Sequence, residues 1–259
     1  GAVGLANCFF LNAASFLAVL LALRLMQLPP PQIAPWKPFL RAWKELLDYL
    51  LERRELKLVL LLMTTAAVLA MPYFVLLPIL ARDTLGVGPR GFGLLMGMSG
   101  LGAFAGGLTL ARRLTRRPPM PSFLAGQGLF LLGLMGLGLC RNYYAALGFM
   151  ALTGFGLVTQ LSTGNSLLQL HVPDALRGRL MSLFGVIVMG FAPVGSILYG
   201  VAAHYVGAGP SITGGAVIAF VVAAFVLLKN PDLRHFGFTA PEPPPPSGPV
   251  PPAITPFSG

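Results

Sequence analysis

The sequence predicts an all-α membrane protein with seven transmembrane helices, and three observations support this class. Of the 259 residues, 55% are hydrophobic and only 10% are charged, whereas soluble domains carry about 25% charged residues. The apolar residues gather in seven runs, and the length of each run is close to the roughly 20 residues that span a bilayer. None of the runs contains Asp, Glu, Lys or Arg, which are costly at the bilayer centre. The runs are residues 5–23, 58–81, 91–111, 121–140, 143–165, 180–203 and 211–228.

The Lys and Arg residues between the runs predict how the chain crosses the membrane. If the runs alternate in direction, 15 of the 18 basic residues lie on one side, and only Arg82, Arg90 and Arg141 lie on the other. The positive-inside rule places the first side, with the C-terminus, in the cytoplasm and the N-terminus outside. We expect a multi-pass protein of a bacterial-type inner cell membrane, with the lipid bilayer as its surroundings. The net charge of +10 then reflects topology, so no nucleic-acid partner is expected.

The segments outside the runs differ in character. The first run begins almost at residue 1, with Gly and no basic flank, so it does not have the pattern of a signal peptide and the chain is expected to be a fragment. Residues 28–57 contain a proline cluster and then an amphipathic helix, expected at the cytoplasmic interface as a linker or as a strap between two halves. Residues 231–259 are expected to form a disordered, Pro-rich cytoplasmic tail.

Glycine and proline mark positions inside the runs. The third run has two pairs of glycines four residues apart, Gly93 with Gly97 and Gly102 with Gly106, which allow helix backbones to approach closely. Three prolines lie inside runs and predict kinks, either static or used for gating. They are Pro72, Pro78 and Pro193.

The fifth run is the most polar and has two polar faces. Thr153, Gln160 and Thr163 share one face, and the other holds Ser162, Asn165, Ser166 and Gln169. Exposure of such polar groups to lipid is energetically unfavourable. They either hydrogen-bond neighbouring helices or line a water-accessible path.

No pattern typical of an enzyme, metal or cofactor site is present. Cys8 and Cys140 lie in apolar runs as small packing residues. His171 and His204 fall at run ends on opposite sides, and no Gly-x-Ser-x-Gly element occurs. We therefore expect no enzymatic activity, no metal and no cofactor. A seven-helix receptor or sensor is an alternative, although the last run has no lysine to hold retinal.

Several segments together resemble the major facilitator superfamily. The element Pro173-Asp174-Ala-Leu-Arg177-Gly178-Arg179 resembles the cytoplasmic loop before the eleventh helix of these transporters, most closely in the drug and siderophore exporter branch that includes the enterobactin exporter. Residues 71–86, 91–103 and 43–55 are similar to its seventh helix, its eighth helix and its central cytoplasmic helix.

The resemblance implies how the chain is organised. The seven runs correspond to helices 6–12 of a twelve-helix major facilitator fold. Residues 1–27 are then the last helix of the N-terminal half, 28–57 the cytoplasmic linker and 58–230 the six-helix C-terminal half. Helices 1–5 of the same transporter are absent from this chain and become an expected partner.

The resemblance also implies a function. We expect a secondary transporter that exports hydrophobic or amphipathic small molecules by alternating access, with proton antiport as the coupling; a non-functional truncated transporter is the alternative. Five residues are expected to contact the substrate: Tyr73, Thr153, Gln160, Thr163 and Met189. Five are expected to form a cytoplasmic loop network: Asp174, Arg177, Arg179, Arg112 and Arg116. Ala111 stands where the family's loop motif has an acid, so an ion-pair lock after the eighth helix is not expected.

Overall fold

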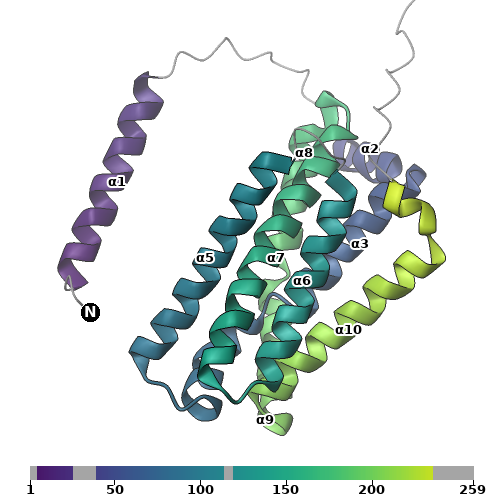
Figure 1. Ribbon diagram of the computed structural model, residues 1–259. Helices are drawn as coiled ribbons and strands as arrows, with labels where there is room; N and C mark the ends of the chain where they lie inside the picture. The colour runs from purple at the N-terminus through teal and green to yellow at the C-terminus, as the bar shows by residue number, and fades with distance from the viewer. Residues whose placement is uncertain (1–4, 26–38, 114–118, 236–259) are drawn as a thin grey trace, which may run out of the picture. The chain divides into compact units, whose positions relative to one another are not determined.

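The computed structural model describes residues 5–25, 39–113 and 119–235, where every regular element is a helix. The chain divides into two compact units, residues 1–37 and residues 38–259. The first unit contains α1 (Leu5–Leu25), a 21-residue apolar helix with Arg24 in its last turn. The second unit contains the remaining helices, which form a bundle (Figure 1).

Six helical stretches of the described residues are long and apolar enough to cross a membrane. With α1 they follow the seven predicted runs in order, which confirms the predicted fold class. Two stretches are interrupted, and α2 (Phe39–Glu52) and the 3₁₀ turn η3 (Pro231–His235) complete the bundle. The stretches are α3 (Arg54–Leu69) with α4 (Tyr73–Ile79) and η1 (Leu80–Thr84), α5 (Pro89–Arg113), α6 (Pro119–Leu139), α7 (Tyr143–Leu170), α8 (Asp174–Gly185) with η2 (Val186–Gly190) and α9 (Ala192–Val206), and α10 (Ala208–Lys229).

Helix α7 packs along both α5 and α6, and α10 packs along α6, α3 and α9. Figure 1 shows α7 between α5 and α6, and it places α2 and α8 at the same end of the bundle. We call this end the α2 end. The buried side chains form two clusters, one around Tyr73 and Phe130 and one nearer the α2 end around Leu56 and Phe123.

Helix α2 is amphipathic and packs onto the bundle with one face. Leu46 and Leu50 are buried in the cluster near the α2 end, while Leu47 and Leu51 are exposed. Helix α2 packs mainly against α3 and α8. The interface helix predicted from the sequence is therefore anchored to this bundle. Its role as a strap between two halves stays a prediction.

The disordered tail was predicted to begin at residue 231, but regular structure continues to residue 235. Residues 231–235 form η3, and Leu233 is 2% exposed in the cluster near the α2 end. An apolar side chain so close to the end of α10 can still reach the core, which explains the difference. The rest of the predicted tail, and residues 28–38 of the linker, lie outside the described residues.

Two membrane stretches are interrupted where prolines remove backbone donors. Helix α3 ends at Leu69 and α4 begins after Pro72; the amides of Ala70 and Met71 both bond to Ala66 O at 2.9 Å. Pro78 lies inside α4, directly before the π-helical turn η1. Pro193 lies in the first turn of α9, after the π-helical turn η2.

Two glycines adopt left-handed backbone conformations at the ends of helical stretches. Gly86 follows η1 with φ of 65°, and Gly207 separates α9 from α10 with φ of 87°. A side chain at either position would strain the backbone. These glycines allow each helix to stop and the next to return antiparallel.

Candidate functional site

One polar face of α7 is buried against α6. Thr153, Gln160 and Thr163 are each at most 2% exposed. Glycines of α6 bring the two backbones together: a Cβ on Gly126 would lie 2.6 Å from Gln160 N, and one on Gly133 would lie 2.8 Å from Thr153 N. Both threonine hydroxyls donate to carbonyls of the preceding turn of α7, at 2.8 and 2.5 Å.

In this structure these three residues are buried between helices, and their expected contact with the substrate stays a prediction. A threonine hydroxyl bonded within its own helix presents mainly its methyl group to a neighbour, so it can pack against a glycine of another helix. Of the two roles that the sequence left open, helix contact is the one the structure shows for this face. The Gln160 Oε1 atom is buried without a hydrogen-bond partner among the described residues.

The second polar face of α7 is only half-buried. It consists of Ser162, Asn165, Ser166 and Gln169, and we call it the polar face of α7. Gln169 Nε2 donates to Asn165 Oδ1 at 3.0 Å, and Ser166 Oγ donates to Ser162 O at 2.9 Å. The Asn165 amide nitrogen and the Gln169 carbonyl oxygen keep hydrogen-bonding capacity. This face therefore offers uncharged donors and acceptors in the half of α7 nearer the α2 end.

Tyr73 and Met189, also expected in the cavity, lie in opposite environments. Tyr73 is fully buried in α4, with its ring edge-on to Phe130 at 6.3 Å between centroids. Its hydroxyl faces the Ser99 side chain of α5 but makes no hydrogen bond of normal geometry. Met189 is 79% exposed on η2. The structure thus leaves Met189 available to a ligand and places Tyr73 in the core.

The two glycine pairs of α5 also lie in different environments. Gly102 and Gly106 lie against α7, where a Cβ on Gly102 would overlap the carbonyl of Ala151, and one on Gly106 would lie 2.8 Å from Phe155 O. Gly93 and Gly97 are exposed and have no neighbouring atom within 4 Å of such a Cβ. The expected close packing therefore does not hold for Gly93 and Gly97 among the described residues. They lie on a face of α5 away from its contact with α7.

Side-chain contacts tie α2 to the rest of the bundle. Arg179 Nη1 of α8 pairs with Glu45 Oε2 of α2 at 3.0 Å, and both side chains are only partly exposed. The Tyr49 hydroxyl of α2 donates to the carbonyl of His171, between α7 and α8, at 2.8 Å. These two contacts hold the polar side of α2 against the α7–α8 turn.

The expected loop network is therefore only partly assembled. Arg179 takes part in it through Glu45, while Arg177 pairs with Asp174 at 2.7 Å within one exposed turn of α8. Arg112 is exposed at the end of α5 and makes no ion pair among the described residues, and Arg116 lies outside them. Glu45 was not among the predicted members of this network, although it lies in the segment 43–55 that resembles the family's central cytoplasmic helix.

A further buried contact was also missed. Normally the carbonyl of Leu69 would accept from the amide four residues later, but the break at Pro72 directs the Tyr73 amide to Ala70 O at 3.3 Å. The hydroxyl of Tyr199 in α9 donates to Leu69 O instead, at 2.5 Å. A carbonyl freed by a proline is a signal that such a donor is needed, but it does not say which helix supplies it.

The side chains do not assemble a metal site in the described residues, where no group of three or more His, Cys, Asp or Glu comes together. The functional candidates are instead an uncharged polar face, an exposed methionine and interrupted helices. Half-buried neutral polar groups suit the recognition of a small molecule within a membrane.

Comparison with known proteins agrees with this arrangement. The model of the family described as transmembrane secretion effector, of the major facilitator superfamily, matches residues 1–243. No curated protein matches the chain. A crystal structure of the E. coli fucose:proton symporter FucP is similar, with a TM-score of 0.63 and 16% sequence identity over 85% of this chain. The match covers 55% of the symporter chain, so this chain spans about half the length of that protein.

Proposed function

The chain belongs to the transmembrane secretion effector family of major facilitator transporters, and on that basis we propose that it forms part of an exporter of hydrophobic or amphipathic small molecules. The helical bundle and its family support a membrane transporter that handles small molecules. The proposal adds the direction of transport and the class of substrate. It also adds the drug and siderophore exporter branch, which the Pro173 to Arg179 element of the sequence resembles.

The observation that carries the proposal is the polar face of α7. Ser162, Asn165, Ser166 and Gln169 provide neutral donors and acceptors, and no Asp, Glu, Lys or Arg lies in residues 143–165 of the same helix. A neutral site does not compensate the desolvation of a charged ligand. It suits a substrate with a large apolar surface and a few hydrogen-bonding groups.

The proposed mechanism is alternating access, in which two bundles rock about the substrate site between them. Because the similar symporter is about twice as long as the matched region, we propose that the working protein contains a second bundle with the family's helices 1–5. The interruptions at Pro72 and at η2 would absorb the changes in backbone angle.

Proton antiport is the coupling that we propose. The predicted apolar runs of this chain contain no carboxylate, so the proton-carrying group would come from the second bundle. The polar face of α7 would then bind the substrate, while a carboxylate of the second bundle would take up and release the proton. Binding and coupling would be separate tasks of the two halves.

The proposed site can be tested by substituting both amides of the polar face. In cells that produce the full transporter, Asn165→Leu combined with Gln169→Leu should reduce efflux of an amphipathic fluorescent dye at least tenfold at an unchanged membrane level. The loss follows because the substrate's polar groups would be left unpaired. Thr65→Val is the matched control, since the Thr65 hydroxyl already bonds to Leu61 O of its own helix at 2.8 Å. Unchanged efflux in the double variant would exclude this face as the substrate site.

A further inference from the structure

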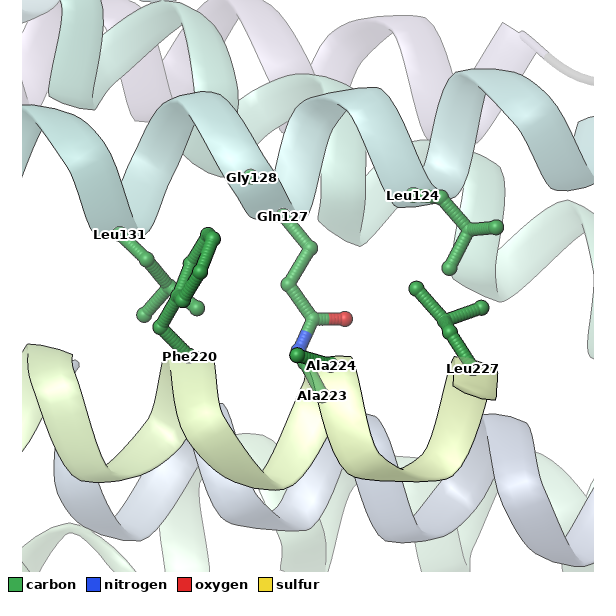
Figure 2. A pocket seen from close by; sticks show the side chains of 8 residues that line it. All are labelled: Leu124, Gln127, Gly128, Leu131, Phe220, Ala223, Ala224 and Leu227. Carbon is green, nitrogen blue, oxygen red and sulfur yellow. The ribbon is translucent and has the colours of Figure 1, made fainter. Parts of the chain in front are cut away.

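Helices α6 and α10 line an open cavity that is separate from the polar face of α7. Its volume is about 170 Å³, close to the size of cavities that hold one aromatic ring in other proteins. Figure 2 shows the Gln127 side chain of α6 reaching across this cavity to Ala223 and Ala224 of α10. Apolar side chains close it at either end of the view, Leu131 with Phe220 and Leu124 with Leu227.

Gln127 is the unusual member of this lining. It is 2% exposed, and neither its Nε2 nor its Oε1 atom has a hydrogen-bond partner among the described residues. Burying an amide without hydrogen-bond partners is unfavourable, because the amide loses its bonds to water and gains none in return. A leucine of similar size would avoid this cost, so the amide is expected to meet a partner that the described residues do not provide.

The residues beside the amide are small. Gly128 on α6 and the alanines on α10 carry little or no side chain, and a Cβ on Gly128 would have no neighbouring atom within 4 Å. Water alone is a poor occupant, because a buried water needs two to four polar partners and Gln127 is the only polar side chain of the lining.

The position of the cavity limits what can enter it. Gln127 is eight residues from the start of α6, about 12 Å along a helix, and the α10 part of the lining ends two residues before Lys229. This depth lies within one leaflet of a bilayer core of about 30 Å. Phe220 is 39% exposed, so the cavity meets the outer surface of the bundle, from which a lipid chain can enter.

From these observations we propose that the α6–α10 cavity binds a single-chain lipid with a neutral carboxyl or carboxamide head. The Gln127 amide presents a donor and an acceptor side by side, and such a head pairs with both. The cavity holds the head and the first carbon atoms, and the remaining chain lies in the leaflet. A phospholipid headgroup is disfavoured because the lining contains no Lys or Arg to bind phosphate.

The test uses the protein in lipid nanodiscs and a C18 primary amide with a photoreactive diazirine on its chain. We expect illumination to label peptides that contain residues 124–131 or 220–227. Gln127→Leu should reduce labelling at least tenfold, while a C18 alkane with the same diazirine should label the variant as well as the parent protein. Equal amide labelling of both proteins would overturn the proposal, as would failure to label either peptide.

Two additional arms keep the outcome decisive. Ala224→Leu retains the amide but fills the cavity, so it should also reduce labelling at least tenfold and replaces Gln127→Leu if that variant does not fold. The C18 carboxylic acid in its protonated form should compete with the amide probe for the cavity. Absence of competition would overturn the carboxyl head and leave only the carboxamide. Crosslinking between two copies of the chain through residues 220–227 would show that a second copy covers the cavity, and would overturn the lipid assignment.

Discussion

The hydroxyl of Tyr199 in α9 supplies the hydrogen-bond donor that the Leu69 carbonyl lacks because of the interruption at Pro72. The Pro72 interruption leaves the Leu69 carbonyl without its usual helical partner, and the Tyr199 hydroxyl donates to it. Gly215 of α10 makes this possible, because a Cβ there would overlap the hydroxyl and lie close to the same carbonyl. In a membrane, such a carbonyl has no water to bond with.

Removing the hydroxyl should therefore destabilise the bundle. We expect Tyr199→Phe to lower the free energy of unfolding by about 1–3 kcal/mol, the usual effect of leaving a buried acceptor unpaired, measured as the midpoint of thermal unfolding in detergent. Tyr205→Phe is the matched control, because Tyr205 is 80% exposed. Equal midpoints for the two variants would contradict the assigned role.

Arg177 and Arg179 lie two residues apart but differ in surroundings. The Arg177 pair with Asp174 is within one turn and exposed, and exposed pairs of this kind contribute about 0–1 kcal/mol. The Arg179 pair with Glu45 joins two helices and is partly shielded from solvent. Of these two expected members of the loop network, Arg179 is the one whose ion pair joins two helices.

The two arginines can be compared directly in the full transporter. Arg179→Ala should reduce efflux several-fold at an unchanged membrane level, because α2 would be held less firmly against α8. Arg177→Ala should have a much smaller effect. The exchange Glu45→Arg with Arg179→Glu should restore part of the efflux that either single change removes, and no restoration would exclude a role for the pair.

At the scale of elements, glycines determine how closely α5 approaches α7. Gly102 and Gly106 lie at the contact, whereas Gly93 and Gly97 lie on an open face of the same helix. The sequence pattern of small residues four apart occurs at both places. The pattern alone could not separate them, because it does not show which face meets α7.

Alanine substitutions should distinguish these two environments. Gly102→Ala should destabilise the chain by about 1–3 kcal/mol, since its Cβ would overlap the Ala151 carbonyl and overpacking costs this much. Gly93→Ala should be neutral or stabilising, by up to about 1 kcal/mol, because alanine favours the helix. Thermal unfolding in detergent measures both; a greater loss for the Gly93 variant would contradict the observed packing.

For the whole molecule, the basic residues predict which end of the bundle faces the cytoplasm. The α2 end carries Arg179 and the other arginines of α2 and α8, while the α6–α7 turn at the far end carries only Arg141. The positive-inside rule therefore predicts that the α2 end faces the cytoplasm. The export direction proposed above depends on this orientation.

Cysteine labelling of intact cells tests the orientation. In a background with Cys8→Ser and Cys140→Ser, Arg141→Cys should react with a membrane-impermeant maleimide from outside. Arg112→Cys should react only after permeabilisation. Both positions are exposed, so access to the reagent depends on the side of the membrane. The reverse pattern would invert the orientation.

The membrane helices could be predicted from the amino-acid sequence alone, because exclusion of charge from runs of about 20 residues depends only on the bilayer. The interruptions at Pro72 and Pro193 could be predicted in the same way, because a missing backbone donor acts within its own helix. Which polar face of α7 is buried, and which helix supplies the donor for Leu69, became visible only in the packed bundle. Those outcomes depend on glycines of α6 and on a tyrosine of α9, which lie close in space but far apart along the chain.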